Sequence, residues 1–470
     1  MPVTLNVNAL KFKDGNSFIP IGAVDSSCEI GFTSPEFFGA IGDGVADDTA
    51  AWQAAVDSGM NVRAFHKAYK CGKITVTKNI TIDCNDADFS CMGTELFEIN
   101  GEVKATLTGQ PNYSANQVGY SLTSTGYRDY TGYAMLQGTN NFDESRLYYY
   151  GGFVCTFRNG VMDGAYPVDA RNGTNNLTVL IIEPVTVNLK NVGTITHPSG
   201  GYPYSIKITY GYGCVVENVK ATKLESYTFI ALNNCLKCTC RNIHFSGEYG
   251  TTGTASYVVA FLNSSYCVLR DSHIYNKFWH CFTTGANYLC YRNLVENCVL
   301  LNDTGYAADD HENGVGTIYR DCTVAGFAPG MQAVIENCIV LSNKNADKRC
   351  AIYTKHPTDQ SLAGVTIADV LFVPDDDCSV CGICLNTYPQ QTGKTYYVDN
   401  VKVERCRVNS DTVTGKVWFG FGADTGAQKN WVIGNLMFND VDLTIDLTCT
   451  NPYADTSNMV AKQAVYEDVT

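Results

Sequence analysis

The feature that most constrains this chain is a short sequence word that recurs along its second half. The word begins with Glu or Arg, continues with Asn or Asp and a small or branched residue, and usually ends on an apolar residue. Between Glu217 and Arg320 successive copies are 24, 29, 26 and 24 residues apart, and a step of 48 then leads to Ala368. The copies lie at 217–221, 241–245, 270–274, 296–300, 320–324, 336–340, 368–372 and 404–408.

A period in the twenties indicates stacked repeats, each too small to bury its own apolar face. The units contain short β segments with Asn, Asp and Gly at the corners, which predicts a parallel β-helix. Leucine-rich repeats share this period, but their leucine–asparagine pattern is absent. The step of 48 is interpreted as two coils of 24, and the copy at Glu336 does not fit that register. Cysteines 24 apart, such as Cys298 and Cys322, predict an internal stack of small apolar side chains.

Charge excludes two classes of partner. The chain has 33 Lys and Arg against 47 Asp and Glu, a net charge of −14. An acidic protein without clustered cations is not expected to bind nucleic acid or an anionic membrane surface. No apolar run of about 18 residues is present to span a bilayer. Residues 1–8 lack the basic and apolar regions of a signal peptide, so the 21 cysteines are expected to be mostly reduced.

The stretch 37–53, FFGAIGDGVADDTAAWQ, resembles the opening motif of the pectate-lyase-like superfamily, which includes bacteriophage tailspikes. This resemblance implies an all-β, right-handed parallel β-helix with a short N-terminal capping helix. Asp43, Asp47 and Asp48 are interpreted as turn and capping residues at the start of that helix. The predicted organisation is a leader at 1–30, opening motif and helix at 31–70, a β-helix at 71–450 with a Tyr-rich insertion at about 111–150, and a tail at 451–470.

The resemblance also implies a function and partners. A tailspike would bind a bacterial surface polysaccharide and cleave it, as a homotrimer on the virion. Residues 1–30 are similar to the short leader of Firmicutes prophage structural proteins, which implies attachment to phage tail or baseplate proteins through this segment. The protein would be made in the host cytoplasm without a signal peptide. A bacterial prophage product is the alternative source.

The densest polar cluster lies at 306–314 and supplies the candidate catalytic residues. They are Asp309, Asp310, His311 and Glu312, with His280 assisting. Side chains alternate along a strand, so Asp309 and His311 would share one face and Asp310 and Glu312 the other. Glycoside hydrolysis requires two carboxylates. A step of about 24 residues from Asp310 meets no acid on a neighbouring coil, which favours an inverting pair within the cluster or with Asp359.

Other interpretations of the same residues remain open. His280 or His311 could act as the base of a polysaccharide lyase, which cleaves by β-elimination. The acids could instead form a turn in a non-catalytic glycan-binding tail protein or in a structural particle component. Aromatic residues predicted to stack on sugar rings, or alternatively to pack the fold, are Trp279, Tyr306, Tyr127, Tyr130 and Tyr149.

Two groups of closely spaced cysteines, at 235–240 and 378–384, suggest a metal site at first sight. Neither group is accompanied by the second Cys pair or the His pair that zinc sites use, and the second lacks the Cys-Pro ending of an iron–sulfur motif. The acidic run at 375–377 lacks an oxygen-rich calcium loop. We therefore predict no metal and no cofactor.

Overall fold

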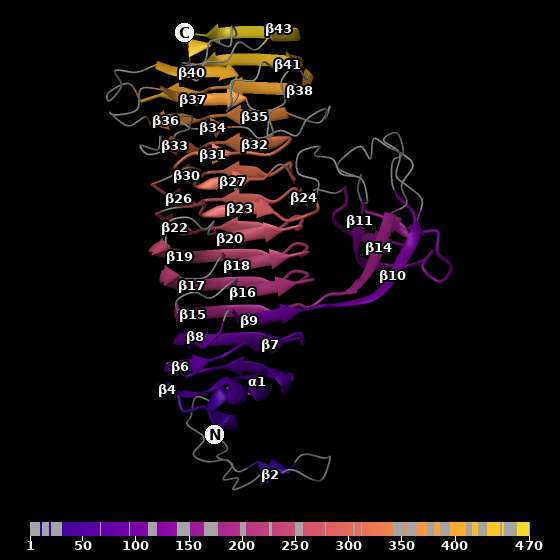
Figure 1. Cartoon of the computed structure of the whole chain (residues 1–470), viewed down its shortest axis with the longest axis vertical. Coiled ribbons are helices and arrows are strands. Elements are labelled where there is room, and N and C mark those ends of the chain that lie inside the picture. The colour runs from indigo at the N-terminus through magenta and orange to yellow at the C-terminus, as the bar shows by residue number, and fades with distance from the viewer. Residues whose placement is uncertain are drawn as a thin grey trace, which may run out of the picture.

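In the computed structural model the chain winds into a tall column of stacked coils with one lobe beside it (Figure 1). A full coil contributes strands to three parallel arrays, here called sides 1, 2 and 3. This confirms the predicted all-β class and the parallel β-helix. The structure describes residues 10–11, 18–19, 31–65, 67–93, 95–110, 120–138, 151–163, 177–197, 204–224, 228–249, 257–277, 279–303, 306–311, 313–341, 352–353, 364–373, 380–385, 395–409, 416–421, 430–441, 444–445 and 458–469.

Sides 1 and 2 are parts of one parallel sheet that bends at a corner. Several strands run through the corner, among them β8 (Thr81–Cys91), β15 (Asn188–Thr196), β17 (Val215–Leu224) and β19 (Thr239–Tyr249). Side 1 also holds β3 (Phe32–Thr33), β5 (Asn61–Arg63), β21 (Val268–Arg270), β25 (Leu294–Glu296), β29 (Ile318–Arg320), β32 (Ala333–Glu336), β35 (Gly364–Ala368), β38 (Thr395–Glu404), β41 (Asn430–Val441) and β43 (Asn458–Val469). Side 2 also holds β4 (Asp43–Asp47), β6 (Ala68–Cys71), β22 (His273–Asn276), β26 (Val299–Leu301), β30 (Thr323–Val324), β33 (Ile339–Leu341), β36 (Leu371–Val373) and β39 (Arg407–Val408).

Side 3 is a separate 12-stranded sheet that closes the column. Its strands are β7 (Ile74–Val76), β9 (Glu95–Asn100), β16 (Tyr204–Thr209), β18 (Thr228–Asn233), β20 (Tyr257–Leu262), β23 (Phe282–Gly285), β27 (Ala308–Asp310), β31 (Phe327–Ala328), β34 (Ile352–Tyr353), β37 (Val380–Leu385), β40 (Lys416–Phe421) and β42 (Thr444–Ile445). Two short strands, β24 (Cys290–Tyr291) and β28 (Gly314–Val315), pair in the turns that lead from side 3 back to side 1.

The recurring word marks the corner between sides 1 and 2. Its second residue has left-handed backbone geometry, with φ of 55° at Asn218, 53° at Asn242 and 51° at Asn297. Asn and Asp tolerate this geometry better than other residues with a side chain. The side chains also form a ladder, in which Asn242 Nδ2 donates to Asn218 Oδ1 at 2.5 Å and Asn218 donates to Asn191 at 2.7 Å.

The copy of the word at Glu336 also forms a corner between sides 1 and 2. Asn337 has the same left-handed geometry, with φ of 52°. Arg320 pairs with Glu336, and Glu336 pairs with Ala368, so one coil has 16 residues and the next has 32. The interpretation of this stretch as two coils of 24 was therefore wrong. The turns between strands vary in length, whereas the strands that they connect stay in register.

The left-handed geometry of the corner leads to a testable prediction about the free energy of unfolding. We expect Asn242→Val to destabilise the fold by about 1–2 kcal/mol, because a β-branched residue is strained at positive φ. Asn242→Gly should cost less, since glycine adopts this geometry freely. The control is Thr239→Val, because Thr239 lies in an extended strand opposite Val268. Urea unfolding midpoints would check this, and equal midpoints for Asn242→Val and Thr239→Val would contradict it.

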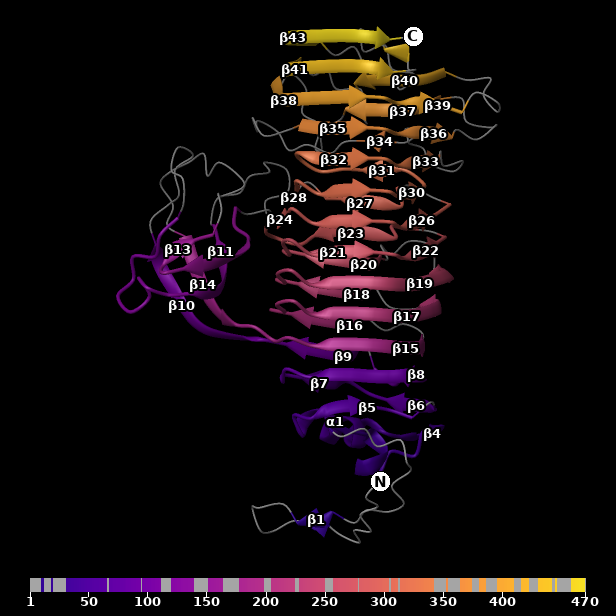
Figure 2. The same cartoon turned by 180° about the vertical axis from the view of Figure 1, so that it is seen from behind.

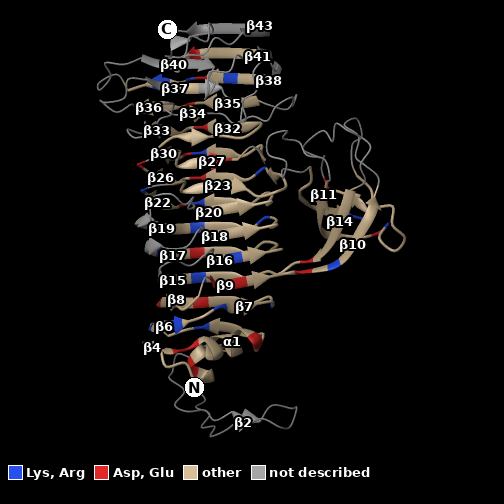
Figure 3. Ribbon diagram, in the orientation of Figure 1, with Lys and Arg blue, Asp and Glu red and all other residues tan. Residues whose placement is uncertain are grey.

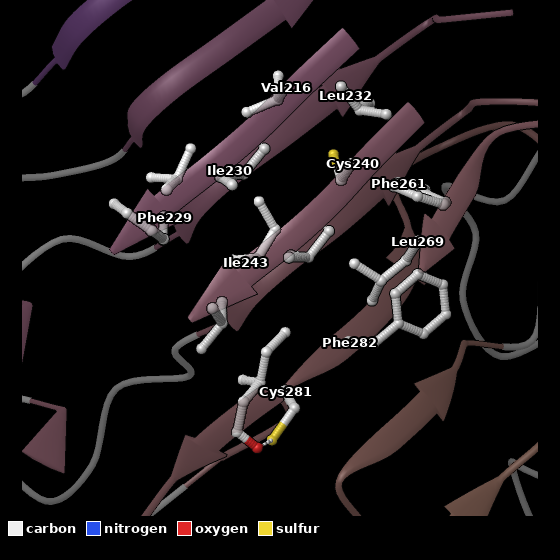
Figure 4. Close-up of a cluster of buried hydrophobic side chains, with 14 of the residues drawn as sticks. Val216, Phe229, Ile230, Leu232, Cys240, Ile243, Phe261, Leu269, Cys281 and Phe282 are labelled. Atoms are coloured by element: carbon white, nitrogen blue, oxygen red, sulfur yellow. Dashed lines mark hydrogen bonds between the residues drawn. The ribbon is translucent and has the colours of Figure 1, made fainter. Parts of the chain in front are cut away.

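The column interior is filled by apolar side chains and by thiols (Figure 4). Cys298, Cys322 and Cys338 directly follow the corner on successive coils, and all are at most 2% exposed. This confirms the predicted internal cysteine stack. Burial also raises the pKa of the Cys281 thiol to about 12, which keeps it protonated at neutral pH. Each cysteine whose side chain the structure describes is a buried free thiol.

Charged side chains lie on the outer surface next to the corner. Figure 3 shows basic and acidic residues alternating where β15, β17 and β19 stack. Arg241 Nε lies 2.5 Å from Glu217 Oε2, and Arg320 contacts Glu336 at 2.5 Å and Glu296 at 3.4 Å. These half-exposed pairs add little stability each, but they favour the in-register stacking of successive coils.

The aspartates of the opening motif form turns as predicted, but the Asp48 side chain does not cap the helix. Asp47 Oδ1 instead accepts a hydrogen bond from the Thr49 backbone at 3.0 Å. Asp43 accepts backbone hydrogen bonds from Val45 and Ala46, and Asp48 accepts them from Ile41 at 2.7 Å and Gly42 at 3.1 Å. A short 3-10 helix, η1 (Pro35–Phe38), precedes it, and the helix α1 (Thr49–Asp57) follows. Figure 1 places α1 at the end of the column opposite β43. Ahead of the column, β1 (Leu10–Lys11) and β2 (Phe18–Ile19) pair antiparallel.

The lobe is an antiparallel sheet of five strands inserted between β9 and β15. The strands are β10 (Glu102–Gln110), β11 (Gly132–Gln137), β12 (Val154–Arg158), β13 (Val161–Met162) and β14 (Leu177–Glu183). Figures 1 and 2 show the lobe standing beside the column. The insertion therefore extends beyond the predicted 111–150, because its flanking strands β10 and β14 carry the alternating pattern of ordinary coil strands.

Two other predicted boundaries also change. Strands β3 to β6 already pair in the sheet of sides 1 and 2, so coiling begins before residue 71. Strand β43 pairs in parallel with β41 up to Val469, so coiling continues past residue 450. The weak pattern at 451–470 concealed a strand because hydrogen bonds to β41, which any backbone can make, hold it there.

Candidate functional site

The two aspartates of β27 point to opposite sides of side 3. Asp310 lies inside the column and is fully buried. Its carboxylate accepts hydrogen bonds from the Thr317 hydroxyl at 3.1 Å and from the Gly330 backbone at 3.3 Å. Burial raises the pKa of Asp310 to about 6. In this position the Asp310 carboxylate has no surface that a polysaccharide could touch.

Asp310 should make stability depend on pH. Folding raises its pKa from 3.8 to about 6, so the folded chain binds the proton more tightly than the unfolded chain. The resulting stabilisation, about 3 kcal/mol, is fully present below pH ~4 and is lost as the pH rises through ~6. Asp310→Asn replaces the carboxyl group with a neutral amide that retains one acceptor oxygen. The contribution of this position to stability should then no longer fall as the pH rises through ~6. Denaturant midpoints at pH 4 and pH 7 would check it; an identical pH response in both proteins would refute it.

Asp309 faces the other way, where it is 1% exposed and is held between two histidines. Its Oδ2 lies 3.1 Å from His280 Nε2 and 3.3 Å from His311 Nε2. The Tyr257 ring stacks on His280 at 5.7 Å with an interplanar angle of 9°, and meets His311 edge-on at 6.3 Å. We call these four residues the Asp309 cluster. The side chains of Asp309 and His311 thus share one face, as the alternation predicted.

The contacts of His280 fix the orientation of its ring. Its Nδ1 contacts the backbone carbonyl oxygen of Tyr306, and its Nε2 contacts the Asp309 carboxylate. His311 is the more accessible histidine, with 22% of its side chain exposed against 10% for His280. The cluster therefore combines one enclosed and one accessible imidazole around a buried carboxylate.

The other predicted site residues are distributed around this cluster. Trp279 meets the His280 ring edge-on at 5.7 Å, and Tyr306 is buried and orients His280 through its carbonyl. Glu312, Tyr149 and Asp359 lie outside the described residues. The sequence prediction missed Tyr257. It lies one coil below His280, and a step of one coil from His280 would have drawn attention to it.

Tyr127 and Tyr130 lie in the lobe, away from the Asp309 cluster. Their rings are 6.2 Å apart, and the Tyr130 hydroxyl donates to the Tyr133 carbonyl oxygen at 2.8 Å. Tyr130 lines a cavity of about 610 Å³ between the lobe and the column. We call this cavity the lobe pocket. The sequence prediction thus grouped aromatic residues that belong to two separate places.

Metal ligands are not gathered anywhere in the described part of the chain. No group of three or more His, Cys, Asp or Glu side chains in these residues could hold a metal ion. Cys235, Cys238 and Cys240 are buried free thiols of the column. Cys378 and the acids at 375–377 fall outside the described ranges. Within those ranges, no helix has the length and hydrophobicity needed to cross a membrane.

Comparison with known proteins gives similarity in structure alone. No protein-family model matches the chain, and no curated protein matches its sequence. The tailspike gp49 of Pseudomonas phage LKA1 superposes with a TM-score of 0.62 at 16% identity, over 93% of this chain and 81% of that one. The tailspike gp61 of Pseudomonas phage phi297 gives 0.56 at 12% identity, over 86% and 80%.

A third structure was solved with a glycan. The Gp54 tailspike of Acinetobacter baumannii bacteriophage AP22, in complex with A. baumannii capsular saccharide, gives a TM-score of 0.55 at 12% identity, over 91% of this chain and 76% of that one. Together these similarities show that the chain has the parallel β-helix fold of bacteriophage tailspikes.

Proposed function

We propose that this chain is a tailspike-like protein of a phage virion that binds a bacterial surface polysaccharide and cleaves it at the Asp309 cluster. The observation that carries the proposal is one buried carboxylate held between two imidazoles, of which that of His311 is 22% exposed. The shared fold, and the capsular saccharide in one tailspike of that fold, support the choice of substrate.

The cluster favours cleavage by β-elimination. In this reaction a base removes the proton next to the carboxylate of a uronate, a carbon–carbon double bond forms, and the bond to the glycosidic oxygen breaks. His311 is the accessible base, and His280, if protonated, would neutralise the uronate carboxylate. The Tyr257 hydroxyl would protonate the leaving oxygen. Asp309 orients both imidazoles and stabilises the charge that His311 acquires.

Inverting hydrolysis, the mechanism predicted from the sequence, requires a second carboxylate about 6.5–9.5 Å from the first. Asp310 points into the column, so Asp309 would have to act with Glu312, which lies outside the described residues. The presence of two imidazoles around a single described carboxylate is the reason for preferring elimination.

Product analysis separates the alternatives. Purified protein is incubated with a panel of capsular and cell-wall polysaccharides, and both reducing ends and ultraviolet absorbance are followed. Elimination yields new reducing ends together with an absorbing unsaturated product, whereas hydrolysis yields reducing ends without absorbance. Binding of a polysaccharide without new ends would show a non-catalytic receptor-binding protein and contradict the proposed cleavage.

We also propose that the chain assembles as a homotrimer through side 1. Val268, Leu294, Ile318 and Val334 are directly stacked on successive coils and point outward, so they form an apolar column on the surface. Such a column favours burial against further copies of the chain. The attachment of residues 1–30 to tail proteins belongs to the same proposal.

A single charge should test the assembly. Ile318→Glu places a carboxylate in the middle of the apolar column, and we expect it to convert trimers to monomers in light scattering after size exclusion. Lys220→Glu, on an exposed position of side 2, is the matched control and should remain trimeric. A monomeric wild-type protein, or a trimeric Ile318→Glu variant, would argue against this interface.

A further inference from the structure

The lobe pocket is a built cavity whose two walls are fixed to each other. One wall comes from the lobe strands β10, β11, β12 and β14, and the other from the column turns at Tyr212 and Lys237. The Tyr133 hydroxyl donates to the carbonyl of Asn234 in the column. Phe153 of the lobe packs edge-on against Tyr291 of the column at 5.6 Å. The pocket is therefore preformed, which lowers the entropic cost of binding.

Its floor is aromatic and apolar. Tyr133 and Ile182, which are paired on neighbouring strands and pack in one cluster, line it and are nearly fully buried. Tyr212 projects from the column into the same space and is only half-buried, with its ring 6.4 Å from that of Tyr133. A volume of about 610 Å³ falls within the ~300–1,000 Å³ of typical small-ligand sites. A half-buried aromatic ring at the edge of such a pocket suits the apolar face of a sugar ring.

Two of the basic residues that line the pocket are paired with carboxylates, whereas Lys237 has no such partner among the described residues. Lys104 lies 2.5 Å from Glu183, and Arg158 lies 3.8 Å from Asp163. Lys237 lies 5.8 Å from the centre of the Tyr212 ring, and no carboxylate of the described residues is within ion-pair distance of it. Such a lysine is notable on a chain with a net charge of −14, which repels polyanions as a whole.

We propose that the lobe pocket is a second glycan-binding site, separate from the Asp309 cluster, that takes an acidic sugar unit. The ring of the sugar stacks on Tyr212 and its carboxylate pairs with Lys237. This inference rests on the proposed function and names the class of glycan. A site of this kind would hold the polymer while the Asp309 cluster cleaves it elsewhere along the chain, which raises the local concentration of cleavable bonds.

The experiment uses immobilised acidic capsular polysaccharides, each with a matched sample whose carboxyl groups have been reduced to alcohols. Binding is measured for the full-length Asp309→Asn protein, so that cleavage does not interfere. We expect Tyr212→Ala in this background to weaken binding ~10- to 100-fold and Lys237→Ala ~5- to 10-fold. Reduction of the carboxyl groups should weaken the binding of the parent protein at least as much as Lys237→Ala does, and should leave little further effect of Lys237→Ala. Added salt should weaken the binding of the parent protein more than that of the Lys237→Ala variant.

The controls separate the pocket from general effects. Tyr212→Phe keeps the ring and should bind like the parent, and Lys220→Ala removes an exposed lysine of side 2 that does not line the pocket. Equal thermal melting of all variants excludes unfolding. Binding that is unaffected by Tyr212→Ala, Lys237→Ala and carboxyl reduction would overturn the inference and leave the proposed function standing. Absence of binding and of cleavage on every polysaccharide would overturn both.

Discussion

Replacing Asp309 with Asn is expected to lower the rate of polysaccharide cleavage by about 100- to 10,000-fold, the usual contribution of general acid–base catalysis. The amide has the size of the carboxylate but no charge, so it cannot orient both imidazoles as the carboxylate does or stabilise a protonated His311. His311→Gln should cause a loss of similar size, because glutamine cannot accept the substrate proton. Initial rates of new reducing ends, measured at saturating polysaccharide, would give both values.

The control for this experiment is Asp271→Asn. Asp271 occupies a corner with φ of 51°, and Asn is the natural residue at several equivalent corners. The same chemical change should therefore leave both folding and cleavage unaltered there. Full turnover by the Asp309→Asn and His311→Gln variants would show that the Asp309 cluster is not the catalytic site, even if the protein cleaves its polysaccharide.

Trp52→Ala should give the largest loss of stability, about 3–5 kcal/mol. Trp52 lies in α1 and is fully buried. Its ring packs edge-on against Tyr69 at 5.2 Å and lies 5.3 Å from Phe89 and 6.0 Å from Phe97. Truncation would leave a large cavity where α1 packs against β5, β6 and β7.

Phe37→Ala is the matched control, because Phe37 is an aromatic residue of the same opening region that is 47% exposed. It should shift the unfolding midpoint by little. Unfolding rates in denaturant allow the kinetic stability of the two variants to be compared even if refolding is incomplete. Similar rates for both variants would mean that α1 contributes little to the stability of the column.

The column could be predicted well from the sequence because the residues that determine each corner are adjacent in the chain and recur from coil to coil. Each copy of the word places Asn or Asp where the backbone needs left-handed geometry, and this demand can be recognised without knowing distant contacts. The inward cysteines were predictable for the same reason. The length of individual coils was not predictable, because a turn of any length can join two strands that remain in register, as the short coil between Arg320 and Glu336 shows.

The candidate site was predicted only in part. Alternation along a strand correctly paired Asp309 with His311, but it could not tell which of the two aspartates points inward. That choice depends on Thr317 and Gly330, whose distance from Asp310 in the sequence hides their role as hydrogen-bond donors inside the column. The lobe pocket was not predictable, because it forms only where β-strands of the insertion meet turns of the column.

The most direct test of the account is a crystal structure of the Asp309→Asn protein with an oligosaccharide of the polysaccharide that it binds. The account predicts a sugar chain against side 3 at the Asp309 cluster, with one unit within hydrogen-bond distance of His311, the accessible histidine. An oligosaccharide bound elsewhere on the protein, with side 3 unoccupied at saturating concentration, would contradict it.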